Sequence, residues 1–471
     1  MEFAFLSIAE LGKLLRQKKT SATELATDFL DRLERIGPQF NAVVTVTRER
    51  ALAEAAQADR DINAGKWKGP LHGIPYGVKD LLATKDYPTT WGAEPYRQQK
   101  FDSDATVVER LGAAGAVLCA KLAMVELAGG MGDNQANASF TGPGKTPWNT
   151  GYWSGGSSSG PGAAVSAGLV PFAIGSETSG SILTPSAYCG VTGLRPTYGL
   201  VSRHGAMALA WTMDKLGPLA RSAEDCGLVL EVIAGKDPKD PSSVARGFAS
   251  PPDPLSATRR GGTKWKIGIP KGADTGIQPE VAANFRAALK LLEDKLEVVE
   301  NVELPDQPYG AVAGVIIAAE GASAFDDLLK DGRLSQLTAP EDRTGGYPAL
   351  AVAAPDYVRA LRARRPMQRA LDDFLKQFDA LAVPTRTTVA NPIDKSFREG
   401  WPGITGGANV IGPTNVVGVP GISVPNGFGV QNLPTGLSFA ARAFDEAKLV
   451  ALARLYQSRS DWHTRKPPLA S

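Results

Sequence analysis

Cysteine and histidine are scarce in this sequence, with three of each among 471 residues. The cysteines, Cys119, Cys189 and Cys226, are an odd number and show no C-x-x-C spacing. This pattern argues against a disulfide framework and against a zinc site, so we expect three small core residues in a reducing compartment. We expect neither a metal ion nor a cofactor.

An excess of either charge is also missing. Lys and Arg total 51 against 49 for Asp and Glu, so no basic field attracts nucleic acid and a small neutral or mixed substrate fits best. A local run of arginines has no interleaved aromatic residues and therefore indicates a solvated, salt-bridged helix face. The run comprises Arg359, Arg362, Arg364, Arg365 and Arg369. We expect no nucleic-acid partner.

Long apolar runs are missing as well. The longest candidate, Ala311 to Ala319, is far shorter than the ~20 residues that span a bilayer. The stretch from Met1 to Arg16 has Glu2, Glu10 and Lys13 between its apolar residues and no small-residue cleavage site, so it does not resemble a signal peptide. The sequence therefore predicts a soluble, cytoplasmic protein without a membrane partner.

The chain does contain an unusual stretch of glycine and small hydroxyl residues from Gly151 to Gly193. Two clusters, GGSSSG at 155–160 and SETSGS at 176–181, flank an apolar segment of Ala, Val and Gly. Glycine sacrifices chain entropy, so the pattern predicts a tight site built from main-chain N–H groups and hydroxyls. Two flexible linkers are the alternative, but each cluster runs directly into compact apolar sequence, which argues against them.

A serine nucleophile needs a base, and the few histidines limit the choice. None of His72, His204 and His463 lies in either cluster. A lysine serves as a base when it is held neutral, and Lys79 follows a short buried strand predicted at 74–78. Its pKa would have to fall by about 2 to 3 units from about 10.4, which requires a dry site. On position alone, a solvated strand-end lysine is the commoner case.

Three motifs follow one another along the chain. They are GPLHGIPYGVKD at 69–80, PGKTPWNT before GGSSSG, and GSETSGSI followed by CGVTGLRPTYGLVSRHG. Together they resemble the amidase signature family of Ser-cisSer-Lys hydrolases, densely over residues 60–235 and again at GVPGISVP and LPTGL. The resemblance implies that Lys79 is the base, Ser157 the bridging serine with a cis peptide, and Ser181 the nucleophile.

The resemblance also implies how the substrate is held. The developing oxyanion would be bound by the backbone N–H groups of Thr178, Ser179, Gly180 and Ser181. Gly130 and Met131 occupy the place where relatives shape the pocket, so they are expected to bind substrate.

The chain departs from the family pattern beside the nucleophile. Most members have Asp, Gly and Arg where this chain has Glu177, Ser179 and Leu183. The backbone N–H donors are unaffected by these changes. However, the apolar side chain of Leu183 replaces an arginine that would pair with nearby polar groups. Glu177 is therefore expected to find other partners.

The alternation of predicted strands and helices indicates an α/β fold. A chain of 471 residues with 43% hydrophobic content suffices for one large body around a big sheet. The resemblance implies a single domain over 1–471, with a mixed central β-sheet covered by helices on both faces. We expect 60–235 to form its core, 236–400 to form an excursion that covers the pocket, and 401–471 to return to the core.

The resemblance implies hydrolysis of a carbon–nitrogen amide bond, or of an ester or carbamate, through an acyl-enzyme on Ser181. Apolar and aromatic residues expected near the nucleophile predict a small, largely apolar substrate. These residues are Leu183, Met131, Tyr76, Trp91, Trp211 and Met207. The assembly state is left open, with a homodimer as one option.

Three other interpretations are compatible with parts of the sequence. GSSSG at 156–160 satisfies the G-x-S-x-G motif of α/β-hydrolases, with Ser158 as nucleophile and His204 or His463 as base. Such a nucleophile should follow a strand, whereas 149–153 is predicted to be a loop. The second is the amidase subunit of a glutamine-dependent tRNA amidotransferase, which shares the same core. The third, a non-catalytic binding protein, is disfavoured because all three catalytic positions are filled.

Overall fold

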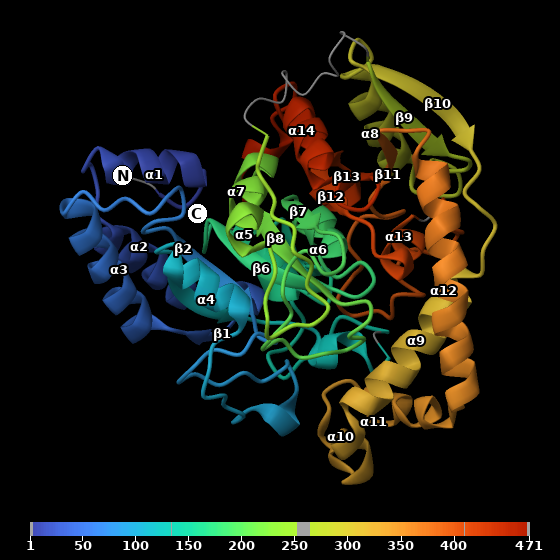
Figure 1. Ribbon diagram of the computed structural model, residues 1–471, viewed down its shortest axis with the longest axis horizontal. Helices are drawn as coiled ribbons and strands as arrows, with labels where there is room; N and C mark the ends of the chain where they lie inside the picture. Colours follow the sequence, from blue (N-terminus) through green and yellow to red (C-terminus); the bar gives the residue numbers. More distant parts are fainter. Residues whose placement is uncertain (1–2, 133, 252–263, 409, 469–471) are drawn as a thin grey trace.

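The computed structural model describes residues 3–132, 134–251, 264–408 and 410–468. Its centre is an 11-stranded sheet in the order β1-β3-β2-β6-β8-β7-β12-β13-β11-β9-β10, which runs through the molecule in Figure 1. The described strands are β1 (Val43–Val46), β2 (Pro75–Lys79), β3 (Val117–Leu122), β4 (Lys145–Thr146), β5 (Asn149–Trp153), β6 (Phe172–Glu177), β7 (Thr192–Arg195), β8 (Lys215–Ala220), β9 (Trp265–Pro270), β10 (Leu296–Val302), β11 (Ala380–Pro384), β12 (Gly421–Phe428) and β13 (Pro434–Ala440).

Strand directions in the sheet are mixed. Strand β2 runs parallel to β3 and β6, and β9 runs parallel to β10 and β11, whereas the other neighbouring pairs are antiparallel. Strands β4 and β5 form a separate two-stranded antiparallel sheet. The expected mixed central sheet is confirmed.

Helices flank the sheet, as predicted. Helices α5 and α6 pack against its central strands, α7 packs against β7 and β8, and α14 packs against β12 and β13. The described α-helices are α1 (Ile8–Arg16), α2 (Ala22–Arg35), α3 (Arg48–Asn63), α4 (Thr106–Ala113), α5 (Ser159–Ser166), α6 (Leu183–Cys189), α7 (Ala223–Ile233), α8 (Pro279–Lys290), α9 (Tyr309–Ala324), α10 (Asp326–Lys330), α11 (Asp342–Gly345), α12 (Ala354–Leu375), α13 (Ile411–Val417) and α14 (Glu446–Gln457). Short 3-10 helices are η1 (Gly37–Phe40), η2 (Glu94–Tyr96), η3 (Glu126–Gly129), η4 (Arg333–Gln336), η5 (Tyr347–Ala351), η6 (Val430–Asn432) and η7 (Trp462–Thr464).

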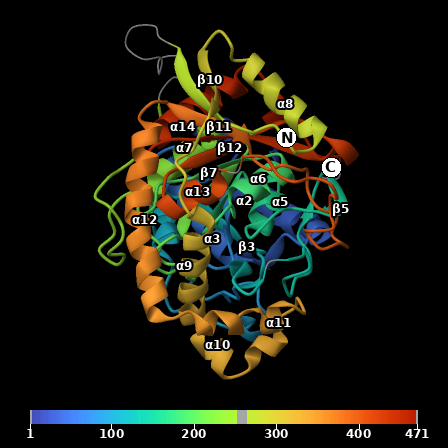
Figure 2. The same ribbon diagram turned by 90° about the vertical axis from the view of Figure 1, so that its right-hand side faces the viewer.

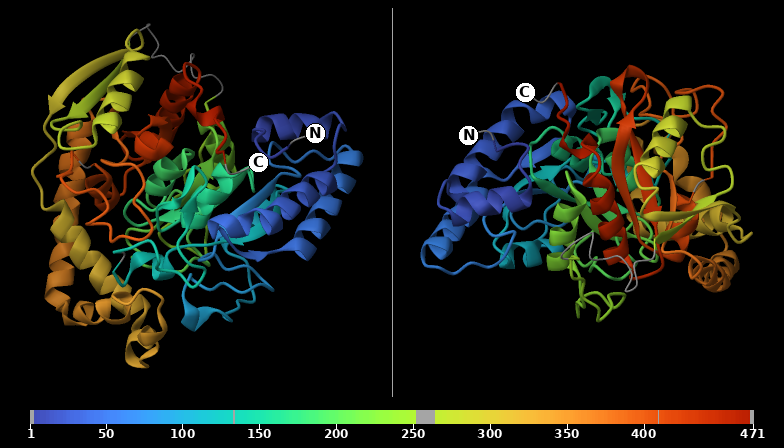
Figure 3. Two further views of the ribbon diagram at one scale, coloured as in Figure 1. Left: turned by 180° about the vertical axis from the view of Figure 1, so that it is seen from behind. Right: turned by 90° about the horizontal axis from the view of Figure 1, so that it is seen from above.

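Two groups of helices lie at opposite ends of the molecule. Figures 1 and 3 show α1 to α3 at one end and the long pair α9 and α12 at the other. Helices α9 and α12 pack on each other, and α10 and α11 lie at one end of that pair (Figure 2). None of the helices in the described part of the chain is long and apolar enough to cross a membrane.

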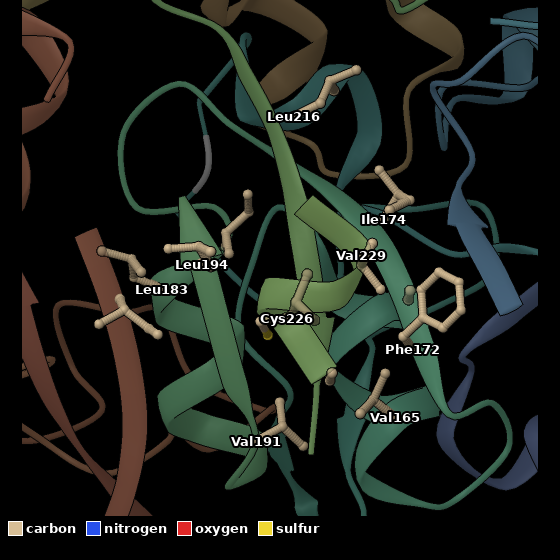
Figure 4. Close-up of a cluster of buried hydrophobic side chains, with 14 of the residues drawn as sticks. Val165, Phe172, Ile174, Leu183, Val191, Leu194, Leu216, Cys226 and Val229 are labelled. Atoms are coloured by element: carbon tan, nitrogen blue, oxygen red, sulfur yellow. The ribbon is translucent and has the colours of Figure 1, made fainter. Parts of the chain in front are cut away.

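An apolar core fills the space between the central strands and their helices. Figure 4 shows Phe172 of β6, Leu194 of β7 and Cys226 of α7 in one cluster, and all three are fully buried. Cys119 and Cys189 are likewise buried and carry free thiols. The prediction that the cysteines are core residues is confirmed.

Two local predictions are wrong. Residues 149–153 form strand β5 and not a loop, because they pair with β4 through Trp153 and Asn149. Arg364 does not belong to a solvated face: its side chain is buried and its Nε donates to the carbonyl oxygen of Val416. Arg359 on the same helix is 75% exposed, as predicted for the run.

The sheet brings the two glycine and serine clusters to Lys79. Strands β2 and β6 are parallel neighbours with Val78 opposite Ile174, so their carboxyl ends meet at one edge of the sheet. Lys79 is the last residue of β2, and Ser176 and Glu177 end β6. This edge, where α5 and α6 also begin nearby, carries the candidate site.

Candidate active site

Lys79 lies in a fully enclosed position, with 0% of its surface exposed. Its Nζ is 2.7 Å from Oγ of Ser157 and 2.9 Å from Oγ of Ser176. The strand end thus carries the amine into contact with a hydroxyl from each of the two sequence clusters. The sequence motifs predict the contact of Lys79 with Ser157 but not its contact with Ser176.

The chain around Ser157 has an uncommon backbone. The peptide bond between Gly156 and Ser157 is cis, as the resemblance implied. Gly155 has a φ of +84°, and a Cβ there would meet the backbone of Pro185 at 2.7 Å, so only glycine fits. This backbone brings the Ser157 hydroxyl to Lys79.

Ser158 is not available as a nucleophile. Its side chain is fully buried, and its hydroxyl donates to the carbonyl oxygen of Ser176 at 3.2 Å. Oγ of Ser158 also accepts a hydrogen bond from the amide of Ser176 at 3.3 Å. These bonds tie the start of α5 to β6. The α/β-hydrolase interpretation, which needs an exposed Ser158, is therefore wrong for this site.

Ser181 lies in the turn between β6 and α6 and is 9% exposed. Gly180 before it has a φ of +94°, a conformation that favours glycine. No described residue provides an acceptor for the backbone N–H groups of residues 178–181. The turn therefore presents unpaired main-chain donors beside a serine hydroxyl, the arrangement that an oxyanion hole requires.

Glu177 holds this turn from behind. Its Oε2 accepts hydrogen bonds from the amides of Ile182 at 2.8 Å and Leu183 at 3.0 Å. Its Oε1 accepts from Nη1 of Arg195 at 2.9 Å and from Nδ2 of Asn415 at 2.7 Å. The carboxylate thus satisfies the first amides of α6, which follow the nucleophile directly.

The ion pair between Glu177 and Arg195 is completely buried. Burial alone would raise the pKa of Glu177, but the Arg195 charge and the hydrogen bonds from Asn415 and Arg195 outweigh it, so this pKa lies below its ordinary value. The other partners expected for Glu177 are therefore Arg195 of β7 and Asn415 of α13. Arg195 lies within the quoted family motif, where its place at the end of an apolar strand could have indicated a buried charge.

Thr178 is fixed from the opposite side of the turn. Its hydroxyl donates to Oδ1 of Asp214 at 2.6 Å, and Oδ2 of Asp214 accepts from the amides of Leu209 at 2.9 Å and Ala210 at 3.0 Å. Burial raises the pKa of Asp214, and burial lowers the pKa of the adjacent Lys215. Both ends of the candidate oxyanion turn are thus anchored by buried side chains.

A second buried ion pair supports the end of β2. Oδ1 of Asp80, the residue after Lys79, lies 3.0 Å from Nζ of Lys121 on β3. Oδ2 of Asp80 accepts from the amide of Thr90 at 3.0 Å. Burial raises the pKa of Asp80 and lowers the pKa of Lys121. The pair locks the strand end that positions Lys79.

A pocket of about 390 Å³ opens at Ser181. The pocket is polar, in contrast to the predicted apolar lining. Two arginines that the sequence motifs do not indicate, Arg386 and Arg398, are among its lining residues. Arg386 lies just after the end of β11, as Lys79 lies at the end of β2. The lining residues are Trp153, Gly156, Ser179, Ser181, Thr184, Tyr188, Arg386, Thr387, Thr388, Asn391, Phe397, Arg398, Trp401, Ile404, Thr405 and Gly406.

The residues expected to line an apolar pocket are dispersed. Met207 and Trp211 line a second pocket of about 160 Å³, which reaches Ser176 and Thr178 on the other side of the turn. Tyr76 is buried and stacks on Phe172. Leu183 is buried in α6, and Trp91 packs against Tyr96 and Phe325.

Gly130 and Met131 line neither of these two pockets. A Cβ on Gly130 would meet Leu209, which lines the second pocket, at 2.6 Å. Met131 is 3% exposed and packs against Gly345 and Gly346. These positions favour a packing role, and substrate binding by the two residues stays a prediction.

Comparison with known proteins identifies the family. The family model described as Amidase matches residues 24–450. The chain belongs to the amidase family. It is thus an amide hydrolase by family, and both the resemblance drawn from the three motifs and the α/β fold are confirmed.

Amidase relatives cover nearly the whole chain. One subunit of the glutamyl-tRNA(Gln) amidotransferase from Moorella thermoacetica is 37% identical, with 100% of this chain and 99% of the relative covered. The peptide amidase structure from Stenotrophomonas maltophilia has a TM-score of 0.86 at 31% identity and covers 99% of each chain. The structure of the corresponding amidotransferase subunit from Thermotoga maritima has a TM-score of 0.78 at 29% identity, over 98% of this chain and 96% of that one.

Proposed function

We propose that the protein hydrolyses the amide bond of a small molecule through an acyl-enzyme on Ser181. Neutral Lys79 accepts the proton of Ser157, and Ser157 accepts the proton of Ser181. The Ser181 oxygen then bonds to the carbonyl carbon. The observation that carries this proposal is the 2.7 Å contact between Lys79 and Ser157 in a site closed to solvent.

The oxyanion that forms on the carbonyl oxygen would be bound by the main-chain donors of residues 178–181. Two observations support this role of the backbone N–H groups. No described residue provides an acceptor for them, and Glu177 and Asp214 anchor the turn that carries them. When the carbon–nitrogen bond breaks, the proton returns through Ser157 to the leaving amine. Water then attacks the acyl-enzyme and gives the free acid. Esters and carbamates present the same carbonyl to the same groups.

A second candidate is an amide-transferring subunit that works within an assembly with tRNA. It is favoured by the 36–38% identity to subunits of glutamyl-tRNA(Gln) amidotransferases over 98–100% of this chain. The first candidate, an amidase that acts alone, is favoured by the structural similarity to this chain. The TM-score is 0.86 for the peptide amidase and 0.78 for the amidotransferase subunit. Three buried free thiols suit a cytoplasmic location for either.

Two measurements on the purified chain test the main candidate. Ser181→Ala is expected to abolish both hydrolysis of simple amides and covalent labelling by a fluorophosphonate, while Ser158→Ala keeps the labelling. Persistent labelling of the Ser181→Ala protein would refute the assigned nucleophile. An isolated chain that is inert toward simple amides but gains activity in an extract containing amidotransferase partners would favour the second candidate.

A further inference from the structure

We propose that the pocket at Ser181 selects amides whose other end carries a carboxylate, which Arg386 and Arg398 bind. This inference rests on the proposed hydrolysis at Ser181 and specifies the substrate class. It replaces the apolar substrate expected from sequence with a monoanionic one.

The guanidinium groups of Arg386 and Arg398 have no counter-ion among the described residues. Neither Arg386 nor Arg398 forms a hydrogen bond or an ion pair with another described residue, and Nε of Arg386 is also shielded from solvent. A buried donor without an acceptor is costly, and native proteins pair nearly all of them. Arginine binds carboxylates in a planar, two-pronged geometry. A ligand carboxylate would therefore satisfy Arg386 and meet Arg398 at the exposed rim.

Two further donors of lining residues are buried and have no hydrogen-bond partner in the described part of the chain. They are Nε1 of Trp153 and the hydroxyl of Tyr188, both on the pocket lining. An indole N–H can only donate, as can a guanidinium. Because both atoms are shielded from solvent, the acceptor that this pocket calls for faces the two guanidinium groups, and an ionised carboxylate is a pure acceptor.

The described lining of the pocket offers no carboxylate to pair with a positive charge. No Asp or Glu is among the lining residues in the described part of the chain. An ammonium group beside Arg386 would be repelled and would lack a carboxylate partner. The charge balance therefore favours a monoanionic amide over a zwitterion such as a free amino acid or over a cation.

A matched set of chromogenic anilides tests this selection. Succinyl p-nitroanilide carries a carboxylate, butyryl p-nitroanilide is its neutral counterpart, and 4-aminobutyryl p-nitroanilide carries an ammonium. The wild-type protein is expected to prefer the succinyl over the butyryl compound in kcat/KM by about 10- to 100-fold, the range for hydrogen bonds to a charged group. The same comparison with 4-acetamidobenzoate and acetanilide covers a carboxylate on the amine side.

Arg386→Gln is expected to abolish most of that preference, and Arg386→Lys to keep part of it. The matched control is Arg359→Gln on the exposed face of α12, which should leave the ratio unchanged. A wild-type preference for the neutral member in both series, or for the cationic p-nitroanilide, would overturn the proposal. Equal losses for charged and neutral anilides in Arg386→Gln would overturn it too.

Binding without chemistry separates this inference from the proposed reaction. Glutarate is expected to raise the Tm of the Ser181→Ala protein, and Ser181→Ala with Arg386→Gln should lose that shift. If Ser181→Ala still hydrolyses amides, the proposed nucleophile fails while the glutarate result stands on its own. If glutarate leaves the Tm of Ser181→Ala unchanged, the carboxylate site fails while the nucleophile stands.

Discussion

Replacing Glu177 by glutamine tests whether the buried carboxylate holds the nucleophile turn. The change leaves Arg195 charged and buried without its ion-pair partner, and an amide NH2 now faces a donor that needs an acceptor. Removing one member of a buried ion pair costs about 3–5 kcal/mol. At about 2.1 cal/mol/K per residue, the unfolding entropy of 471 residues is close to 1 kcal/mol/K, so Tm should fall by about 3–5 °C.

Differential scanning calorimetry at neutral pH measures this shift, with Glu303→Gln as a matched control. Glu303 is 74% exposed in its pair with Lys271, so its loss should change Tm very little. Because the folded pKa of Glu177 lies below its ordinary value, its stabilisation is present above the unfolded pKa. The difference between wild type and Glu177→Gln should therefore shrink as pH falls through the folded pKa. An unchanged Tm at neutral pH would refute the anchoring role of Glu177.

Two further predictions concern the candidate reaction. Lys79→Ala and Ser157→Ala should lower kcat by similar factors, and the double variant should be little worse than either in steady-state kinetics, because a relay acts as one unit; fully additive losses would mean that Ser157 only packs the turn. Replacing His204 and His463 together by alanine should retain amide hydrolysis on the same substrates, since the proposed relay runs from Lys79 through Ser157, and loss of activity in a folded double variant would contradict the lysine base.

The parts of the site that follow from local sequence could be predicted. Lys79, Ser157 and Ser181 lie in dense motifs, and the structure brings Ser157 to Lys79 with the cis peptide that the resemblance implied. Helix starts follow local rules as well: Ser7 and Ser21, each with a glutamate three residues later, form capping boxes. The sequence does not predict the strand at 149–153, because its pairing partner β4 is only two residues long and gives little pattern.

Contacts between distant segments could not be predicted. Asn415 binds Glu177 across 238 residues of chain, and no periodicity links the two positions. The pocket combines Trp153 and Tyr188 with Arg386 and Arg398, more than 190 residues away along the chain. Individual aromatic or arginine residues are ordinary in any sequence, so only the fold reveals that these four line one pocket.

At the position of Leu183 most family members have an arginine beside the nucleophile. In this chain Arg195 supplies a positive charge to the same turn from another strand. Because residue 183 is leucine, α6 has no arginine at this position. The side chains of Leu183 and Arg195 are neighbours: a Cβ on Gly421 would meet Nη2 of Arg195 at 3.0 Å and Cδ1 of Leu183 at 3.4 Å. Arg195 reaches Glu177 from the neighbouring strand β7 and also donates to the Val419 carbonyl oxygen at 2.9 Å. The positive charge that supports the turn thus comes from the rigid sheet, and an apolar residue on α6 is compatible with an intact turn.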